Sequence, residues 1–168
     1  MEMFRELYEK EFMYIIKDIL NNDEFLKTKE KVHHGITRYD HLMRVAYYSF
    51  LVSKFLKLNY KETTRAALLH DFFLDETKDD NKLQALQRHP IYALENAKRY
   101  YDLTPLQEDI IKTHMFPVTF EPPKYIESWI VDLVDDFAGV YEQYKSSCKE
   151  LKAAVTFLLI FVVNFIQK

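Results

Sequence analysis

Apolar residues along the chain recur at helical spacing, and no useful length of sequence alternates apolar and polar residues with a period of two. Residues 2–20 place apolar side chains three or four positions apart, with charged residues between them. Residues 39–58 repeat this pattern. Each segment therefore predicts an amphipathic helix, and the whole pattern predicts an all-α fold.

Prolines and capping residues predict where the later helices begin. Asn59 followed by Glu62 is a capping-box pattern, and Thr104 with Gln107 is a second one that encloses a proline. Pro90 stands where the first residue of another helix is expected. The predicted helices are 60 to about 73, 90–100, 105 to a point before 117, and 124–144 after the 122–123 Pro-Pro loop.

Composition indicates one folded domain spanning residues 1–168. The chain has 168 residues, of which 48% are hydrophobic and 15% aromatic, so it is too apolar for a disordered chain. Only two glycines are present, which disfavours a glycine-rich nucleotide loop. A net charge of −3 offers no basic face for nucleic acid. Cys148 is the single cysteine, which excludes a disulfide framework and a cysteine zinc cluster.

The two ends of the chain bear on its location. The first residues are acidic and lack the basic start and apolar run of a secretion signal, so we expect a cytoplasmic protein. Residues 153–166 carry no charge over 14 positions. As a helix this segment is about 21 Å long, whereas a bilayer core needs about 30 Å. We expect a central core helix there, with a homodimer interface and a membrane anchor as alternatives.

Histidine and aspartate residues supply the candidate chemistry. His70 and Asp71 end an apolar helix, where burying them without partners would cost several kcal/mol (about 2–7 for a neutral group). Other predicted helices or their ends carry His41, His89, His114 and Asp135. Imidazole and carboxylate ligands together suit Fe, Mn, Co, Ni or Zn better than Mg or Ca. The sequence thus predicts a metal site, with Asp132 and Asp136 as competitors of Asp135.

The order His41, His70-Asp71, Asp135 resembles the HD superfamily of metal-dependent phosphohydrolases, which is all-helical. The runs HLMRVA (41–46) and AALLHD (66–71) are similar to its first two motifs, and the similarity covers roughly residues 33–145. His89 and His114 match the extra histidines of its dinuclear members, which include bacterial diadenosine tetraphosphate hydrolases and cyclic dinucleotide phosphodiesterases.

This resemblance implies a site with two divalent ions, Fe or Mn being favoured over Ni, Co or Zn. His41, His70, Asp71 and Asp135 would hold the first ion, His89 and His114 the second, and Asp71 would bridge them as the central catalytic ligand. The metals would activate a water molecule for attack on phosphorus.

One position departs from the family pattern. Many members carry Lys three residues after the Asp, where this chain has Leu74. Another cation must then contact the phosphate, and the candidates near the motifs are Arg38, Arg44, Lys78, Arg88 and Lys112. Arginine is the better phosphate clamp because its planar fork binds two oxygens. We expect Arg38, Arg44 and His34 to bind substrate, and a solvated 33–35 turn is the alternative for His34.

The function predicted from these residues is hydrolysis of a small phosphoester, for which a nucleotide is one candidate. Two alternatives remain open. A related helical site could hold two irons and activate oxygen, and Leu74 leaves room for a non-catalytic sensor of metal or nucleotide. The expected partner is a small phosphorylated substrate. No nucleic-acid or membrane binding is evident in the sequence, although nucleic acid is not excluded as a substrate, and the C-terminal helix is the candidate homodimer contact.

Overall fold

The computed structural model describes residues 2–33, 36–74 and 81–166, and the side chains of these residues except 2–4, 32–33, 82 and 149–166. Helices dominate this part of the chain, so the all-α prediction is confirmed. The elements in chain order are α1 (Glu2–Leu20), α2 (Asp23–Leu26), the 3₁₀ turn η1 (Lys27–Glu30), β1 (Val32–His33), β2 (Ile36–Thr37), α3 (Arg38–Phe55), α4 (Tyr60–Leu69), α5 (Lys82–Tyr100), α6 (Pro105–Thr113) and α7 (Ile126–Ile166).

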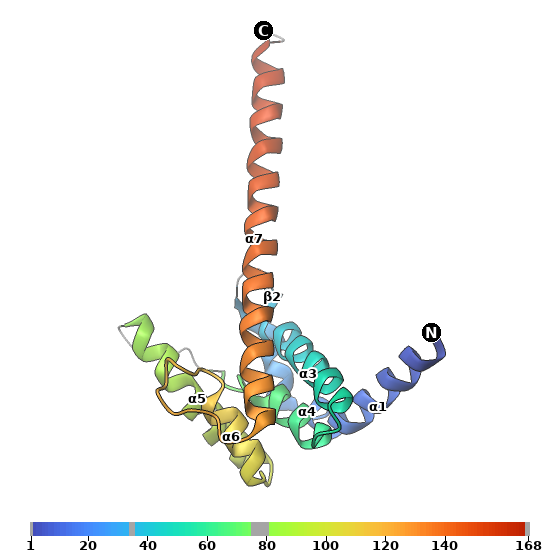
Figure 1. Cartoon of the computed structure of the whole chain (residues 1–168). Helices are drawn as coiled ribbons and strands as arrows, with labels where there is room; N and C mark the ends of the chain where they lie inside the picture. The colour runs from blue at the N-terminus through green and yellow to red at the C-terminus, as the bar shows by residue number, and fades with distance from the viewer. Residues whose placement is uncertain (1, 34–35, 75–80, 167–168) are drawn as a thin grey trace.

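The core lies around the pair α3 and α4. Helices α1, α6 and α7 pack against α4, and α3 also contacts α7 (Figure 1). Phe25, Phe50 and Phe72 are the largest fully buried side chains, and each stabilises the fold by about 1.5–3 kcal/mol. This packing fixes the ends of α4 and α6 and the middle of α7, which carry much of the site described below.

A small hairpin precedes α3, although the pattern of the sequence gave no indication of strands. Strands β1 and β2 contain two residues each and pair antiparallel, with Val32 opposite Thr37. Strands this short cannot produce a readable period of two, because each shows a single alternation. The hairpin leads directly into Thr37, whose hydroxyl caps α3 by accepting from the Asp40 amide at 3.0 Å.

Two predicted boundaries are wrong. Helix α4 ends at Leu69 instead of about Phe73, because the amides of Phe72 and Phe73 bond back to Leu69 and Asp71 in turns. Helix α5 begins at Lys82, and Pro90 lies inside it. The side chain of Asn81 caps this helix by accepting from the Leu83 amide at 3.0 Å. A proline removes one backbone bond but does not always end a helix.

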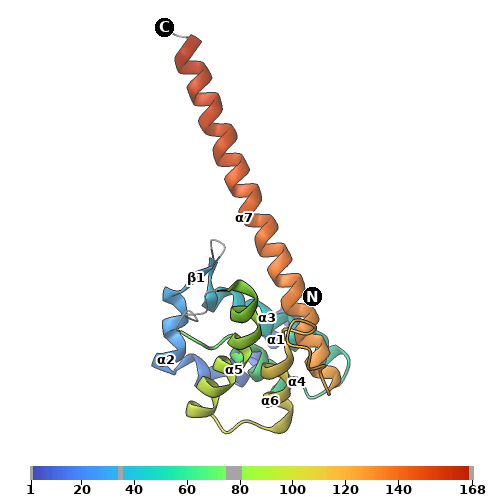
Figure 2. The same ribbon diagram turned by 90° about the vertical axis from the view of Figure 1, so that its left-hand side faces the viewer.

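The segments predicted as two helices over 124–144 and 153–166 form one continuous helix, α7. In both views its C-terminal part lies far from the other helices (Figures 1 and 2). The side chains of 153–166 are outside those that the structure describes, so the expectation of a core helix there stays a prediction. Across the part of the chain that the structure describes, no helix has the length and hydropathy of a membrane span.

Candidate metal centre

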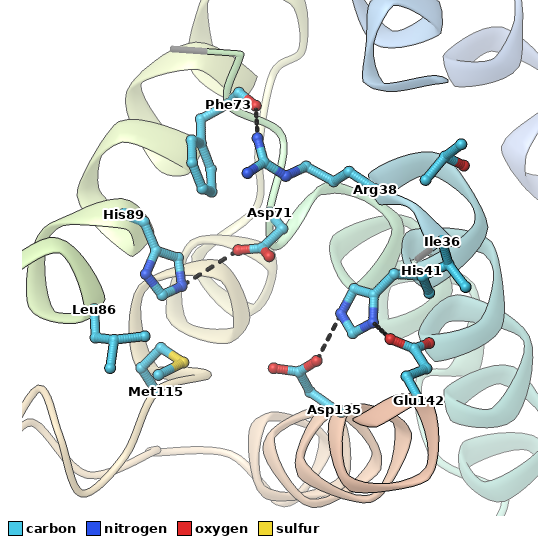
Figure 3. Close-up of a pocket in the computed structure, with 12 residues that line it drawn as sticks. Ile36, Arg38, His41, Asp71, Phe73, Leu86, His89, Met115, Asp135 and Glu142 are labelled. Carbon is cyan, nitrogen blue, oxygen red and sulfur yellow. Dashed lines mark hydrogen bonds and ion pairs between the residues drawn. The ribbon is translucent and has the colours of Figure 1, made fainter. Parts of the chain in front are cut away.

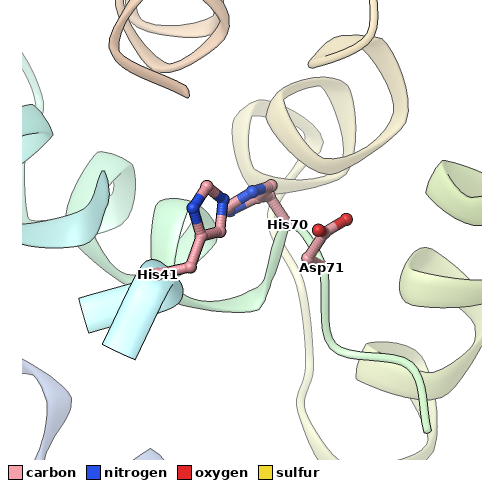
Figure 4. A group of neighbouring side chains, drawn as sticks. All are labelled: His41, His70 and Asp71. Carbon is pink, nitrogen blue, oxygen red and sulfur yellow. The ribbon is translucent and has the colours of Figure 1, made fainter. Parts of the chain in front are cut away.

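Six imidazole and carboxylate side chains converge from five helices. His41 lies in the first turns of α3, and His89 lies in α5 immediately before Pro90. The ends of two helices supply His70, at the C-cap of α4, and His114, at the C-cap of α6. Asp71 follows α4, and Asp135 extends from α7 (Figures 3 and 4). All six residues predicted as metal ligands are therefore brought together.

Asp135 joins two histidines in one half of the cluster. Its Oδ1 lies 2.9 Å from Nε2 of His41 and 3.4 Å from Nε2 of His70. The rings of these histidines are 5.4 Å apart between centroids (Figure 4). Of the competing carboxyls, Asp136 is exposed, and Asp132 is buried with an Oδ1 that has no hydrogen-bond partner among the described residues.

Asp71 joins two other histidines in the second half. Its Oδ1 lies 3.3 Å from Nε2 of His89 and 3.5 Å from Nε2 of His114 (Figure 3 draws the first contact). The two Nε2 atoms are only 2.9 Å apart. Three possible ligand atoms thus surround one point.

Backbone carbonyls fix the tautomers of three histidines. Nδ1 of His70 donates to the Ala67 carbonyl at 2.7 Å, and Nδ1 of His114 donates to the Ile111 carbonyl at 2.8 Å. Nδ1 of His89 donates to the Ala85 carbonyl at 3.3 Å. Since a carbonyl only accepts, each of these Nδ1 atoms carries the proton, and in the neutral ring Nε2 presents a lone pair. This is the orientation of metal-bound histidines, whose other nitrogen donates to a neighbouring group.

The two facing Nε2 atoms of His89 and His114 therefore need a positive charge between them. Burial is the largest cause that lowers the pKa of His89 to about 4, with His114 and His70 acting in the same direction and Asp71 opposing them, so His89 resists protonation. A cation bound to both nitrogens and to Asp71 satisfies all three. His70 Nε2 and Asp71 Oδ1 are also buried without a hydrogen-bond partner among the described residues, and a metal ion would supply one.

The carboxylates of the cluster remain ionised despite their burial. Burial opposes the charge of Asp71, but His89, His114 and His70 hold the pKa of this carboxyl well below its ordinary value. Burial likewise opposes the charge of Asp135, whose pKa His70 and His41 lower. Both side chains are thus in the state that metal binding requires.

The donor atoms fall into three overlapping groups in which every donor atom lies within 4.8 Å of the others. The groups are His41 with His70 and Asp71, His70 with His114 and Asp135, and Asp71 with His89 and His114. The residues present therefore fit a divalent metal. Mixed nitrogen and oxygen ligands are typical of Mn, Fe, Co, Ni and Zn sites.

A comparison with protein families finds that residues 38–139 match the HD domain. The chain belongs to the HD domain family. Most members of this family are metal-dependent hydrolases, and HD domains bind divalent metals. No curated protein and no solved structure matches the chain.

The sequence analysis missed a further residue of the site, Glu142, which follows the residues 38–139 that match the HD domain. Glu142 lies seven residues after Asp135 on the same face of α7, and its side chain is buried. Its Oε2 accepts from Nδ1 of His41 at 3.0 Å, and its Oε1 accepts from Arg44. Glu142 thus fixes the tautomer of His41 as the carbonyls fix the other three. The available signal in the sequence was the spacing of seven residues between Asp135 and Glu142, which places both on one face of a helix.

A cavity of about 250 Å³ opens beside the cluster of this HD domain (Figure 3). His41, Asp71, His89, Asp135 and Glu142 form its polar wall. The remaining lining residues are Ile36, Thr37, Arg38, Phe73, Leu86, Met115 and Gly139.

Among the described lysines and arginines, Arg38 lines this cavity. Its guanidinium lies 3.8 Å over the ring of Phe73 and donates to the Phe73 carbonyl. Arg44 does not line the cavity but pairs with Glu142, and Lys112 pairs with Glu121 at 2.6 Å. His34 and Lys78 lie outside the described residues.

Proposed function

We propose that this HD domain is a phosphohydrolase that binds two divalent transition-metal ions, Fe or Mn in preference to Ni, Co or Zn, and cleaves a small phosphoester or nucleotide. The observation that carries the proposal is the 2.9 Å separation of the His89 and His114 Nε2 atoms, whose Nδ1 atoms are both committed to carbonyls. Two lone pairs at this distance repel each other unless a shared proton or a metal cation lies between them, and the low pKa of His89 favours the metal.

The proposed division of the ligands between the two ions follows two of the three donor groups, the one with His41 and the one with His89. His41, His70, Asp71 and Asp135 would hold one ion, and Asp71, His89 and His114 the other. Asp71 is the bridging candidate because it is the carboxylate that occurs both in the group with His41 and His70 and in the group with His89 and His114. When bound, the ions would lower the pKa of a water molecule and neutralise charge on the phosphoryl oxygens.

The residues of the chain would contribute orientation and charge to the reaction. The carbonyls of Ala67, Ala85 and Ile111 hold three imidazoles in one tautomer, so little reorganisation is needed when the site is loaded. We propose that Arg38 takes the part of the family lysine that Leu74 replaces, by contacting the substrate phosphate in the cavity. Its stacking on Phe73 limits the freedom of the guanidinium, which favours a defined phosphate position.

The lining of the cavity favours one kind of leaving group on the phosphate. Phe73, Leu86 and Met115 give it an apolar wall next to the metal ligands. A leaving group with an apolar or aromatic face, such as a nucleoside, would bury its ring there while the phosphate approaches Arg38 and Asp71. We therefore place phosphoesters with a ring-bearing leaving group ahead of inorganic pyrophosphate as candidate substrates.

The test combines metal analysis with hydrolysis. Protein purified without added metal is analysed for metal content, and then assayed with Mn²⁺ or Fe²⁺ on a generic aryl phosphodiester and a nucleotide panel. We expect two ions per chain and hydrolysis that Asp71→Ala abolishes. The matched control is Asp136→Ala, since Asp136 is an exposed carboxylate on the neighbouring part of α7, and this variant should keep full turnover.

The alternatives give different results in the same experiment. Unchanged turnover in Asp71→Ala would reject the mechanism. Two irons with oxygen consumption and no phosphate release would indicate the diiron oxygenase. Bound metal with tight nucleotide binding and no hydrolysis would indicate the sensor.

A further inference from the structure

Helix α7 has two faces of opposite character. Ser128, Val131, Ala138 and Glu142 are buried and lie three, four or seven residues apart, together with the metal-site residue Asp135. This stripe faces the body and carries part of the site. It occupies one side of the helix, because residues at this spacing share a face.

The opposite side of α7 is apolar and exposed. Leu133, Phe137, Val140 and Tyr144 are 52%, 74%, 70% and 68% exposed. These residues are separated by four, three and four positions, which is the spacing of the contact positions in a coiled coil. Side chains of this size are normally buried, and a contiguous exposed set marks an interaction surface.

The same spacing continues along the whole of α7. With steps of four and three, the contact positions are Ile126, Ile130, Leu133, Phe137, Val140, Tyr144, Ser147, Leu151, Ala154, Leu158, Phe161 and Phe165. All of them except Ser147 are apolar. We call this set the heptad stripe. A strict 3.5-residue repeat favours a left-handed supercoil with another helix, whereas packing on a globular surface sets no such period.

Among the described residues, no other element of the chain covers the stripe from Leu133 to Tyr144, where its side chains are exposed. Helix α7 runs along one side of the body and then projects beyond it (Figure 2). An isolated helix gains little stability in water without tertiary packing. A groove of about 440 Å³ between α3 and α7 flanks the stripe, with Tyr48, Val52, Phe137 and Tyr141 in its lining. Side chains of a second helix could enter this groove.

We propose that α7 pairs with α7 of a second copy of this chain in a parallel two-stranded coiled coil, in register along the heptad stripe. A parallel pair sets each stripe residue against its own copy, so every apolar position meets an apolar position. Of the carboxylates over residues 126–148, Asp132, Asp135 and Glu142 lie on the body side of α7. The exposed Asp136 disfavours a membrane as the occupant, since anionic lipids would repel it. Gly139 and Glu142 line the metal-site cavity from the other side of α7, so the metal-site cavity of each copy stays open in the dimer.

The test measures the mass of the full-length protein in solution and the orientation of its helices. By sedimentation equilibrium we expect twice the mass of one chain. Phe137→Glu places two carboxylates against each other in the stripe and should raise the dimer dissociation constant by about a hundredfold or more. The matched control is Tyr14→Glu, because Tyr14 is 81% exposed on α1 and lies off the stripe. Circular dichroism reports whether each variant is folded.

Cysteine cross-linking tests the register. Val140→Cys in a Cys148→Ser background should form a disulfide between copies under mild oxidation, since a parallel pair places the two residues 140 opposite each other. A folded Phe137→Glu protein that remains dimeric, or a wild-type protein that is monomeric, would overturn the proposal. Monomers that float with vesicles of phosphatidylcholine and phosphatidylglycerol would assign the stripe to a membrane instead.

Discussion

The tautomer of each of the four histidines in the candidate metal centre is fixed by the group to which its Nδ1 donates. His70, His89 and His114 donate to backbone carbonyls three or four residues earlier in the chain. His41 donates to Glu142, which lies 101 residues later. The first three partners follow from local helix geometry, whereas the fourth depends on the packing of α3 against α7.

Replacing Glu142 should weaken metal binding without unfolding the protein. Glu142→Ala removes the acceptor for His41 Nδ1 and leaves that ring free to adopt the other tautomer. Loss of such an outer partner costs about 10–100-fold in metal affinity, which calorimetric titration with Mn²⁺ would measure. Glu142→Gln keeps an acceptor and should lie between Glu142→Ala and wild type. Gln143→Ala is the matched control on the exposed side, and an unchanged affinity in Glu142→Ala would contradict this role.

Asp132 should make stability depend on pH. Burial, the nearby charge of Asp136 and that of Asp135 raise the pKa of Asp132 from 3.8 to about 7, despite a bond from the Phe116 backbone. Between these values the folded state holds a proton that the unfolded state has lost, so the contribution of this group to stability falls as pH rises from about 4 to about 7. Asp132→Asn cannot ionise. Its melting temperature should exceed that of wild type above pH 7, and the difference should vanish near pH 4; a constant difference would refute this.

At the scale of elements, the capping residues fix where a helix begins and ends, and so where a candidate metal ligand at its end lies. Thr104 caps α6 in a capping box, in which its hydroxyl accepts from the Gln107 amide while the Gln107 side chain accepts from the Thr104 amide. The same helix ends at His114. Because the rise per residue is constant, the position of the N-cap Thr104 also determines the position of the C-cap His114.

Thr104→Ala should lower the free energy of unfolding by about 1 kcal/mol through loss of the cap. The Thr104 hydroxyl also donates to Glu62, and this hydrogen bond connects α6 to the start of α4. The substitution therefore removes a contact between the two helices as well as the cap. Urea denaturation would measure the change. Thr104→Ser retains a capping hydroxyl and should stay within a few tenths of a kcal/mol of wild type. Equal destabilisation by both variants would show that the methyl group, and not the cap, is responsible.

The whole molecule should be stabilised by metal, because the ligands join α3, α4, α5, α6 and α7. Mn²⁺ at a hundredfold excess over its dissociation constant should add about 2.7 kcal/mol to the free energy of unfolding. Removal by a chelator should reverse the rise in melting temperature measured by calorimetry. Asp71→Ala should lose the response and Asp136→Ala should keep it. A rise of equal size in Asp71→Ala would place the stabilising metal elsewhere.

Local sequence signals predicted much of the fold. Spacing and capping predicted α1, α3 and α6 closely, since their apolar periods and caps are contained within each segment. They failed at α5, where Pro90 is tolerated inside the helix, and at the end of α4, where turns close on Leu69 and Asp71. Both failures lie beside metal ligands.

The sequence by itself determined the helical class and the types and order of the candidate ligands, because these depend on residue identity and spacing. Only the tertiary structure decided which atoms face one another. It set the His89 and His114 nitrogens 2.9 Å apart, selected Glu142 as the partner of His41 and left the stripe from Leu133 to Tyr144 exposed on α7. Such distances arise from the packing of helices far apart in the chain, which no local pattern encodes.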